Sequence, residues 1–249
     1  NLSGHSKPRD YGNDVMWVSE TFGLGAICLI EDPDHPEMVS RPRFSPTCTK
    51  GPLYDTRFAF YTVLNGPLRS MIRAKAKNWQ SGKGEYEVTQ DYTAYAGKAY
   101  STCKVHFDKF FPENGATQFG VGMRKIMNEY KATQREGLVI SHGKDLDVFG
   151  DPNMSLLDRS KKKIIAWEGI GLVVLNKYHP KNYDIEAYGG NHLMRMPLTE
   201  DHGYEFMMLL GWSDGFVNKT EKEFEDYVFK AAQEYNQPVK ATEFMIEKK

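Results

Sequence analysis

Apolar and polar residues alternate along much of this chain, which is the pattern of half-buried β-strands. In residues 85–95, for example, Tyr86 and Val88 fall on one side and Glu85 and Glu87 on the other. Such runs recur roughly every ten residues between turn-forming Gly, Pro and Asn, as in all-β proteins. We expect strands at 14–18, 25–30, 57–64, 69–79, 85–95, 99–107, 118–124, 137–141, 164–175 and 204–212.

One helix is expected near the end of the chain. Its apolar face, at helical spacing, comprises Phe224, Tyr227, Val228, Ala231, Ala232 and Tyr235,. Thr220 and Glu223 form a capping box at its start, and Pro238 follows its end,. Because helices do not alternate with the strands, a doubly wound α/β fold is disfavoured. We predict a mainly β protein, a large antiparallel β-sandwich with a C-terminal helix, forming a single domain over residues 1–249.

The strand expected at 69–79 has one apolar and one cationic face. Ile72, Ala74 and Ala76 alternate with Arg69, Met71, Arg73, Lys75 and Lys77. The whole chain has a formal charge of only -1, so a focused positive strand indicates a site for an anionic ligand,. The alternative, which the pattern alone favours, is an ordinary solvated strand face.

Composition narrows the function classes. The 14 Tyr, 14 Phe and 4 Trp suit both β structure and the stacking of sugar rings,. No apolar run is long enough for a membrane span, and basic and acidic residues are intermixed, which is not the footprint of nucleic-acid binding. Three cysteines make no disulfide scaffold, and we expect Cys28 and Cys103 to be small core residues,. The chain starts at Asn1, which is compatible with a removed export signal.

Histidines supply the candidate chemistry. His142 and His202 lie at the expected ends of strands, where catalytic groups often occur,. His192 and His202 bracket an expected turn, so they could face each other as zinc ligands, although two independent histidines are the favoured interpretation. Near the start, His5, Lys7 and Tyr11 belong to a polar cluster, and a polar arm without a site would look similar. No nucleophile elbow or phosphate-binding loop occurs in the sequence.

Several short segments, taken in order, resemble a known family. They are DYGND at 10–14, TFGLGA at 21–26, LNGPLR at 64–69, GIG at 169–171, YEF at 204–206 and LGWS at 210–213. Over about residues 10–244 the chain is similar to the C-terminal two-thirds of bacterial proteins of formerly unknown function. These occur in gene clusters that use uronate-containing algal and plant polysaccharides, ulvan among them. The resemblance therefore implies the C-terminal part of a longer family domain.

The resemblance implies a fold and an activity. The fold would be a supersandwich like that of galactose mutarotases and some polysaccharide lyases. The activity would be β-elimination on uronate oligosaccharides by a carbon–oxygen lyase, either a dehydratase or a polysaccharide lyase, which gives an unsaturated uronyl product. A mutarotase-like epimerase and a non-catalytic glycan-binding protein remain the alternatives. We expect a periplasmic or secreted protein that binds an acidic oligosaccharide. We expect no nucleic-acid partner, no membrane association and no cofactor. Two alternatives stay open: a metal ion held by histidines, and a homo-oligomer.

Roles follow from this chemistry. Arg69 would neutralise the uronate carboxylate, because a guanidinium binds a carboxylate through two hydrogen bonds. His142 and His202 would be the base and the acid, with Tyr11 as an alternative acid. The expected substrate-binding residues are His5, Lys7, Arg73, Lys75, Lys104, His106, His192 and Trp212, the last as a stacking platform.

Overall fold

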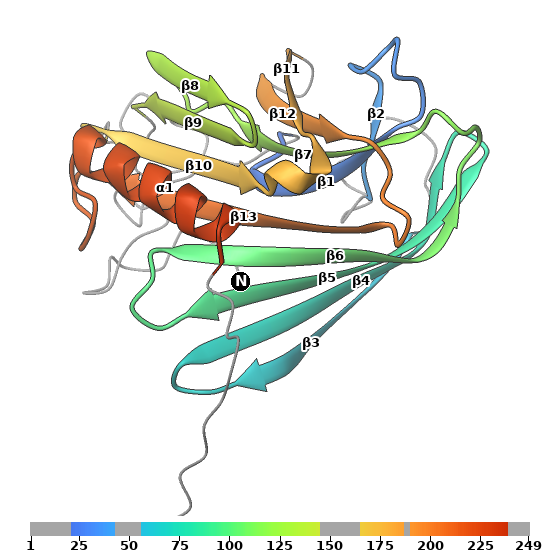
Figure 1. Ribbon diagram of the computed structural model, residues 1–249, viewed down its shortest axis with the longest axis horizontal. Helices are drawn as coiled ribbons and strands as arrows, with labels where there is room; N and C mark the ends of the chain where they lie inside the picture. Colours follow the sequence, from blue (N-terminus) through green and yellow to red (C-terminus); the bar gives the residue numbers. More distant parts are fainter. Residues whose placement is uncertain (1–20, 43–55, 145–164, 187–189, 239–249) are drawn as a thin grey trace, which may run out of the picture.

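The computed structural model describes residues 21–42, 56–144, 165–186 and 190–238. Within these ranges the strands form two antiparallel sheets (Figure 1). The large sheet has the order β3 (Arg57–Asn65), β4 (Arg69–Ser81), β5 (Gly84–Tyr95), β6 (Tyr100–Phe111), β13 (Gly203–Trp212), β10 (Glu168–Val174), β9 (Leu138–Gly143) and β8 (Lys131–Arg135). The small sheet has the order β11 (Lys181–Ile185), β12 (Asn191–Met196), β7 (Gln118–Arg124), β1 (Leu24–Ile30) and β2 (Val39–Ser40). This confirms the predicted mainly β fold, in the form of a sandwich.

The main hydrophobic core lies between the two sheets. Inward-facing residues of both contribute, such as Val121 from β7 and Phe206 from β13. In Figure 1, β3, β4 and β5 fan away from the small sheet, so part of the large sheet has no sheet opposite it. Along β4, Ala74 and Ala76 are buried as predicted, whereas Ile72 on the same face is 53% exposed. The incomplete cover of the large sheet explains this difference.

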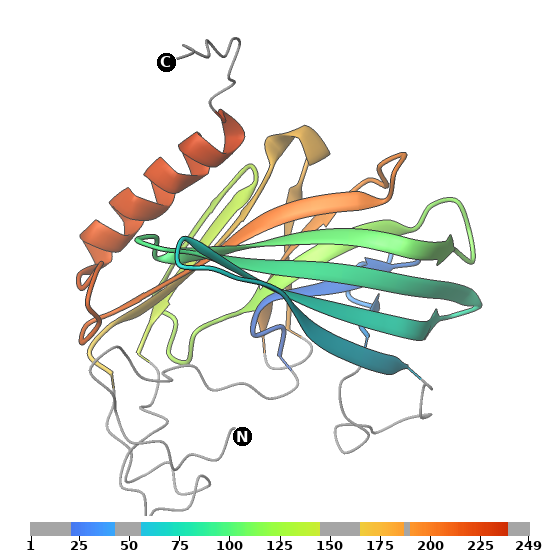
Figure 2. The same cartoon turned by 90° about the horizontal axis from the view of Figure 1, so that it is seen from below.

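The helix α1 (Glu221–Asn236) packs on the opposite face of the large sheet, over β9 and β10 (Figure 2). Its predicted apolar face is confirmed, with Phe224 and Val228 fully buried. Close approach depends on glycine: a Cβ at Gly169 or Gly211 would come within 2.7 or 2.8 Å of the Phe224 ring. The capping box is also present, since the side chain of Thr220 accepts a hydrogen bond from the backbone of the third helical residue,.

The positions of the strands agree closely with the alternation pattern. Among the strands of the described ranges, four were not predicted from the sequence: β2, β8, β11 and β12. β8 is a polar edge strand, and β12 carries large side chains on both faces, so neither shows a simple alternation,. The strand expected at 14–18 lies outside the described residues. The predicted core cysteines Cys28 and Cys103 are both buried. In the described part of the chain, the helix is too short and polar to cross a membrane.

Candidate functional site

A groove of about 590 Å³ lies between the start of β1 and the uncovered inner face of the large sheet. Its volume is in the range of roughly 300–1,000 Å³ that is typical of small-molecule sites. Leu24 from β1 forms one side, and Ile72, Tyr92 and Met208 line it from the large sheet. The groove therefore lies where the small sheet stops covering the large one.

Small side chains in one register row make the hollow. Ser70 of β4 pairs with Ala94 of β5, which pairs with Ser101 of β6, and the larger Met208 of β13 ends this row. In the next row the sheet carries the larger Tyr92, opposite Ile72. A row of small residues beside a row of large ones leaves a depression in the sheet surface. Tertiary register, rather than any one strand, creates this groove.

One tyrosine of the groove can donate a hydrogen bond. Burial raises the pKa of Tyr92, so its phenol stays protonated around neutral pH,. Tyr100 also borders the groove, but its ring packs with the cluster beneath the helix, on the other face of the sheet. The Nε2 of Gln90 donates to the Tyr92 hydroxyl at 2.7 Å and orients it. In the described part of the chain, no histidine, aspartate or glutamate lines the groove. Hydroxyl groups and Lys98 supply its polar side chains.

Lys98 lies in the turn between β5 and β6, and Arg69 starts β4 beside it. The backbone of Ala96 donates to the carbonyl of Leu68 at 2.9 Å, so the two turns are adjacent. Lys98 lines the groove, whereas Arg69 lies next to the lining residue Ser70 and its side chain alternates to the outer face. Neither cation makes an ion pair with a residue in the described ranges. Of the two, only Lys98 belongs to the groove, and its ammonium lies 5.8 Å from the centroid of the Tyr100 ring.

Trp212, the predicted stacking platform, lies on the same face of β13 as the groove residues Met208 and Leu210. It is two residues beyond Leu210 and opposite Glu168 of β10. Gly215 in the following turn lies against its indole ring, because a Cβ there would come within 2.8 Å of it. Its position beside the groove suits the predicted role, which remains a prediction.

The cationic face of β4 is neutralised within the large sheet. Arg73 donates two hydrogen bonds to Asp91 on β5, at 2.6 and 2.7 Å. These hydrogen bonds raise the pKa of Arg73. Lys75 lies 3.4 Å from Asp108, and Lys104 lies 3.8 Å from Glu205. Asp91 and Glu205 come from strands that pair with those of Arg73 and Lys104, whereas Asp108 comes from β6, two strands away from Lys75 on β4. The prediction that Arg73, Lys75 and Lys104 hold carboxylate or sulfate groups of the substrate stays a prediction, although each of them already faces an acidic residue.

His142 is buried completely beneath the helix. Its Nδ1 accepts a hydrogen bond from Trp167 Nε1 at 3.2 Å, and its Nε2 lies 3.2 Å from a carboxylate oxygen of Glu225. Burial lowers its pKa, so it is neutral and donates from Nε2,. With both ring nitrogens engaged on the helix side of the sheet, His142 is an internal hydrogen-bonding residue.

The predicted catalytic residues do not converge. His142 pairs with Gly169, which pairs with Gly211, and that residue lies nine positions from His202. In an extended strand this is about 30 Å. Arg69 lies five strand spacings from His142, about 24 Å,. A single sugar cannot span these distances, so the prediction that His142 and His202 form one acid–base pair beside Arg69 is wrong.

His202 lies in the loop before β13, in a left-handed conformation with φ of 48°. Its ring stacks on Phe110 with centroids 4.2 Å apart. The hypothesis that it faces His192 across a hairpin is wrong, because β12 and β13 belong to different sheets. His106 lies on the outer face of β6, opposite Gly203, and its predicted substrate contact remains a prediction. Tyr11, His5 and Lys7 lie outside the described residues.

One group of side chains has the composition of a metal site. Ligand atoms of His142, Glu221 and Glu225 lie within 4.8 Å of one another. However, the ammonium of Lys131 lies 2.5 Å from Glu221 and 2.8 Å from Glu225. These contacts raise the pKa of Lys131, and the hydrogen bond from Lys131 lowers that of Glu221. The lysine thus supplies the positive charge that a metal would bring, and a bound metal would have to displace it.

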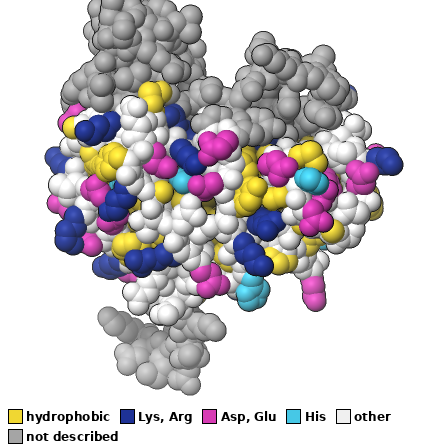
Figure 3. All heavy atoms as spheres, turned by 90° about the horizontal axis from the view of Figure 1, so that it is seen from above, with side chains coloured by type: hydrophobic (Ala, Val, Ile, Leu, Met, Phe, Trp, Pro, Cys, Tyr) yellow, Lys and Arg dark blue, Asp and Glu magenta, His cyan; other side chains and the backbone are white. Residues whose placement is uncertain are grey.

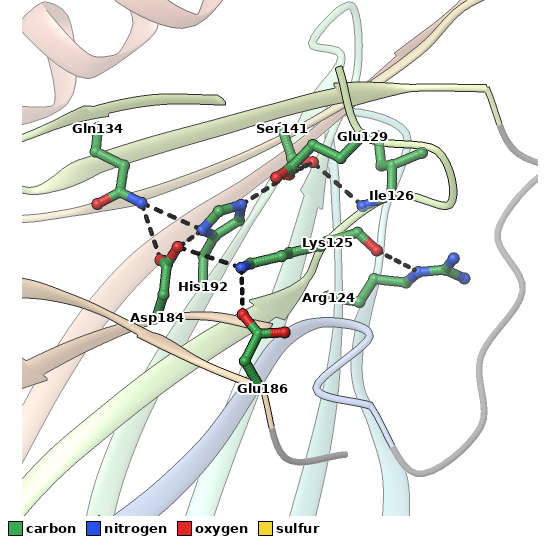
Figure 4. A network of polar contacts seen from close by, with 9 residues as sticks. All are labelled: Arg124, Lys125, Ile126, Glu129, Gln134, Ser141, Asp184, Glu186 and His192. Carbon is green, nitrogen blue, oxygen red and sulfur yellow. Dashed lines mark hydrogen bonds and ion pairs between the residues drawn. The ribbon is translucent and has the colours of Figure 1, made fainter. Parts of the chain in front are cut away.

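His192 lies in a second polar network, on β12 beside the edge strand β11 of the small sheet (Figure 4). Its Nδ1 is 2.8 Å from Asp184 on β11, and its Nε2 is 2.8 Å from Glu129 in the segment between β7 and β8. Both ring nitrogens are therefore occupied by carboxylates of the protein, and the side chain is 2% exposed. The predicted contact of His192 with substrate is corrected to an internal role.

The molecular surface shows no broad cationic patch on the face seen in Figure 3. There, basic and acidic side chains are intermixed outside the grey atoms. Sequence reasoning missed Lys98, although it lies in a Gly97–Lys98 turn directly after a predicted strand. A lysine in a hairpin turn is common, and only the adjacent turn that carries Arg69 makes its position notable.

Comparison with known proteins gives a family without a function. A family model described as a domain of unknown function (DUF4861) matches residues 3–241. None of the curated proteins matches the chain.

Proposed function

Since the chain belongs to the DUF4861 family, whose description names no activity, we propose from the site itself that it acts on acidic oligosaccharides. The activity that we propose is β-elimination on a uronate residue, by a dehydratase or a lyase. The observation that carries this proposal is the groove with Lys98 at its end, a cation without an acidic partner in the described ranges; Arg69 lies on the outer face of the same end of the sheet. Elsewhere on the sheet, Arg73 and Lys75 are paired with carboxylates.

The chemistry makes specific demands on such a site. A base removes the proton on C5, and the electron pair of the broken C5–H bond forms the C4–C5 double bond. The oxygen on C4 leaves with its bonding electrons and takes up a proton from an acid. Negative charge develops beside the uronate carboxylate, so a nearby cation stabilises the transition state. Lys98 at the groove is suited to this task, with Arg69 at the outer rim. The phenol of Tyr92, which stays protonated, suits hydrogen bonding to sugar oxygens.

A second candidate function is the binding of acidic glycans without catalysis. It is favoured by one observation: the described residues that line the groove include neither a histidine nor a carboxylate that could remove the C5 proton. The predicted acid Tyr11 lies outside the described residues. The epimerase alternative also needs a histidine and a carboxylate around one carbon, and the same observation weighs against it. A periplasmic or secreted location remains part of the proposal through the family resemblance.

The product distinguishes these functions. The protein is mixed with a panel of uronate oligosaccharides, and the ultraviolet absorbance of the conjugated double bond is followed together with product masses. Absorbance with loss of water from an intact oligosaccharide indicates a dehydratase, and absorbance with chain scission indicates a lyase. Binding without an unsaturated product would support the glycan-binding function. If the protein neither binds nor converts any acidic oligosaccharide of the panel, the proposal is overturned.

Lys98→Gln should weaken binding of an acidic oligosaccharide by about tenfold, or about 1.4 kcal/mol, because a charge-assisted hydrogen bond is lost. Isothermal titration calorimetry measures the change. Lys83→Gln is the matched control, since Lys83 is also in a hairpin turn but at the other end of β4 and β5. Lys104→Gln tests the outer face and should leave affinity unchanged. An equal loss for Lys98→Gln and Lys104→Gln would contradict the assignment to the groove.

A further inference from the structure

One buried imidazole joins the two sheets of the sandwich at their edge. His192 lies on β12, on the same face as the core residues Met194 and Met196, and so points toward the large sheet. It contacts Asp184 in its own sheet and Glu129 in the segment that leads into β8 of the other sheet. Figure 4 shows the ring between these two carboxylates. The contact is therefore an inter-sheet bridge rather than a link within one hairpin.

The bridge is complete only when the imidazole is protonated. A neutral histidine has one N–H, whereas the imidazolium has two. Each ring nitrogen lies 2.8 Å from a carboxylate oxygen, so two N–H groups are needed to donate to both. In the neutral form one nitrogen lone pair would face an anionic oxygen at the same distance. Geometry alone thus favours the charged form in the folded protein.

The surrounding groups hold both carboxylates in place. Gln134 of β8 donates to Asp184 at 2.9 Å, and its amide nitrogen lies 3.3 Å from Nδ1 of the imidazole. Lys125 at the end of β7 lies 3.3 Å from Asp184 and 2.8 Å from Glu186. With His192 charged, the three carboxylates of this network face two cations.

Glu129 is in turn fastened to the large sheet. The hydroxyl of Ser141 on β9 donates to Glu129 and accepts a hydrogen bond from the backbone of Ile126 at 3.2 Å. His192, Glu129 and Ser141 therefore form a chain of contacts from β12 to β9. The edge strand β11 is attached to the large sheet through this chain and also directly to β8, where Gln134 donates to Asp184 at 2.9 Å and Asn182 donates to the carbonyl of Arg135 at 2.8 Å.

We propose that His192 is a protonation-dependent latch that fastens the β11–β12 edge of the small sheet to the large sheet, and that loss of its proton loosens this edge. The proposal does not depend on what the groove binds. The charged groups that face the ring are Asp184, Glu129 and, through Asp184, Lys125, and each of them is held by a further partner.

The expected pH window follows from the direction of each shift. Burial lowers the pKa of His192, but its hydrogen bonds to Glu129 and Asp184 outweigh burial and raise the pKa above the ordinary 6.5. Burial raises the pKa of Glu129 and of Asp184, but their hydrogen bonds to His192 outweigh it and lower both. The histidine contribution is complete below pH 6.5 and is lost as the pH rises through the raised value. The carboxylate contributions are complete above their ordinary values and are lost in acid.

The test uses the full chain and two measurements. NMR titration gives the pKa of the His192 ring, and hydrogen exchange, corrected for the intrinsic rate at each pH, gives the protection of the β11 amides. We expect His192 to titrate above 6.5, and protection of β11 to fall by about tenfold or more once the ring is neutral. Protection of β5 amides, far from the latch, should not follow this titration.

Asp184→Asn is the diagnostic variant, because it keeps an oxygen for Nδ1–H but removes the charge. In this variant the pKa of His192 should be lower by about 1, and the β11 amides should lose protection at a correspondingly lower pH. Asp226→Asn, which removes an exposed carboxylate on α1, should change neither value. A His192 pKa at or below 6.5, or β11 protection that is indifferent to the ring's titration, would overturn the latch.

Discussion

Replacing Ser101 with tryptophan is expected to weaken binding of an acidic oligosaccharide by at least about a hundredfold, or about 2.7 kcal/mol. Ser101 lies in the row of small residues that makes the groove, between Ala94 and Met208. An indole placed there would occupy the space in which a sugar ring would lie. Its side chain would project into open space rather than into the core, so we expect the fold to remain intact. Calorimetry measures the affinity, and circular dichroism checks the fold.

Lys104→Trp is the matched control for this variant. Lys104 is on the same strand, three residues away, but on the outer face beside Glu205. A tryptophan there introduces the same indole ring on the face opposite the groove, and affinity should be unchanged. Unaltered binding by a folded Ser101→Trp protein would instead exclude the groove as the site. Such a result would remove the observation on which the proposed function rests.

Phe224→Ala should lower the free energy of unfolding by about 3–5 kcal/mol, which is the usual cost of removing a buried aromatic ring. Phe224 is the main anchor of α1, with its ring 5.8 Å from that of Trp167 and 6.1 Å from that of His142. Gly169 and Gly211 accommodate it and could not fill the cavity left behind. Urea unfolding measures the change, with tryptophan fluorescence as one signal.

Phe216→Ala provides the comparison, because this ring is 64% exposed in the loop before the helix. Its removal should change stability by less than about 0.5 kcal/mol. If Phe224→Ala cost as little as Phe216→Ala, the helix would not be held by its apolar face. The cluster of Trp167, Phe224 and Val228 would then contribute less to the free energy of unfolding than its burial indicates.

The cationic strand illustrates how far the sequence could be interpreted. Alternation alone placed Ala74 and Ala76 inside and Arg73 and Lys75 outside, and this is confirmed. It could not show that Asp91 and Asp108 lie beside those cations. Asp91 is 18 residues from Arg73, and the two meet only because β4 and β5 pair in one particular register. The strand that looked like an anion site is therefore largely neutralised.

The histidines illustrate the same limit. His142 and His202 both follow the pattern of residues at strand ends, but they lie at distant places on the large sheet. His192 meets Glu129 across 63 residues and two sheets, through a strand that has no clear alternation. Because β12 has large side chains on both faces, no periodic signal marked it as a strand.

The sequence by itself determined the elements: most strands, the inward and outward faces of β4, the buried cysteines and the capped helix. These depend on local periodicity and capping, which act within a few residues. Tertiary structure alone decided which charges are paired, where the groove opens and what holds His192. Each of these depends on the register of strands that are far apart in the chain, and a shift of one residue would turn every side chain of a strand to the other face.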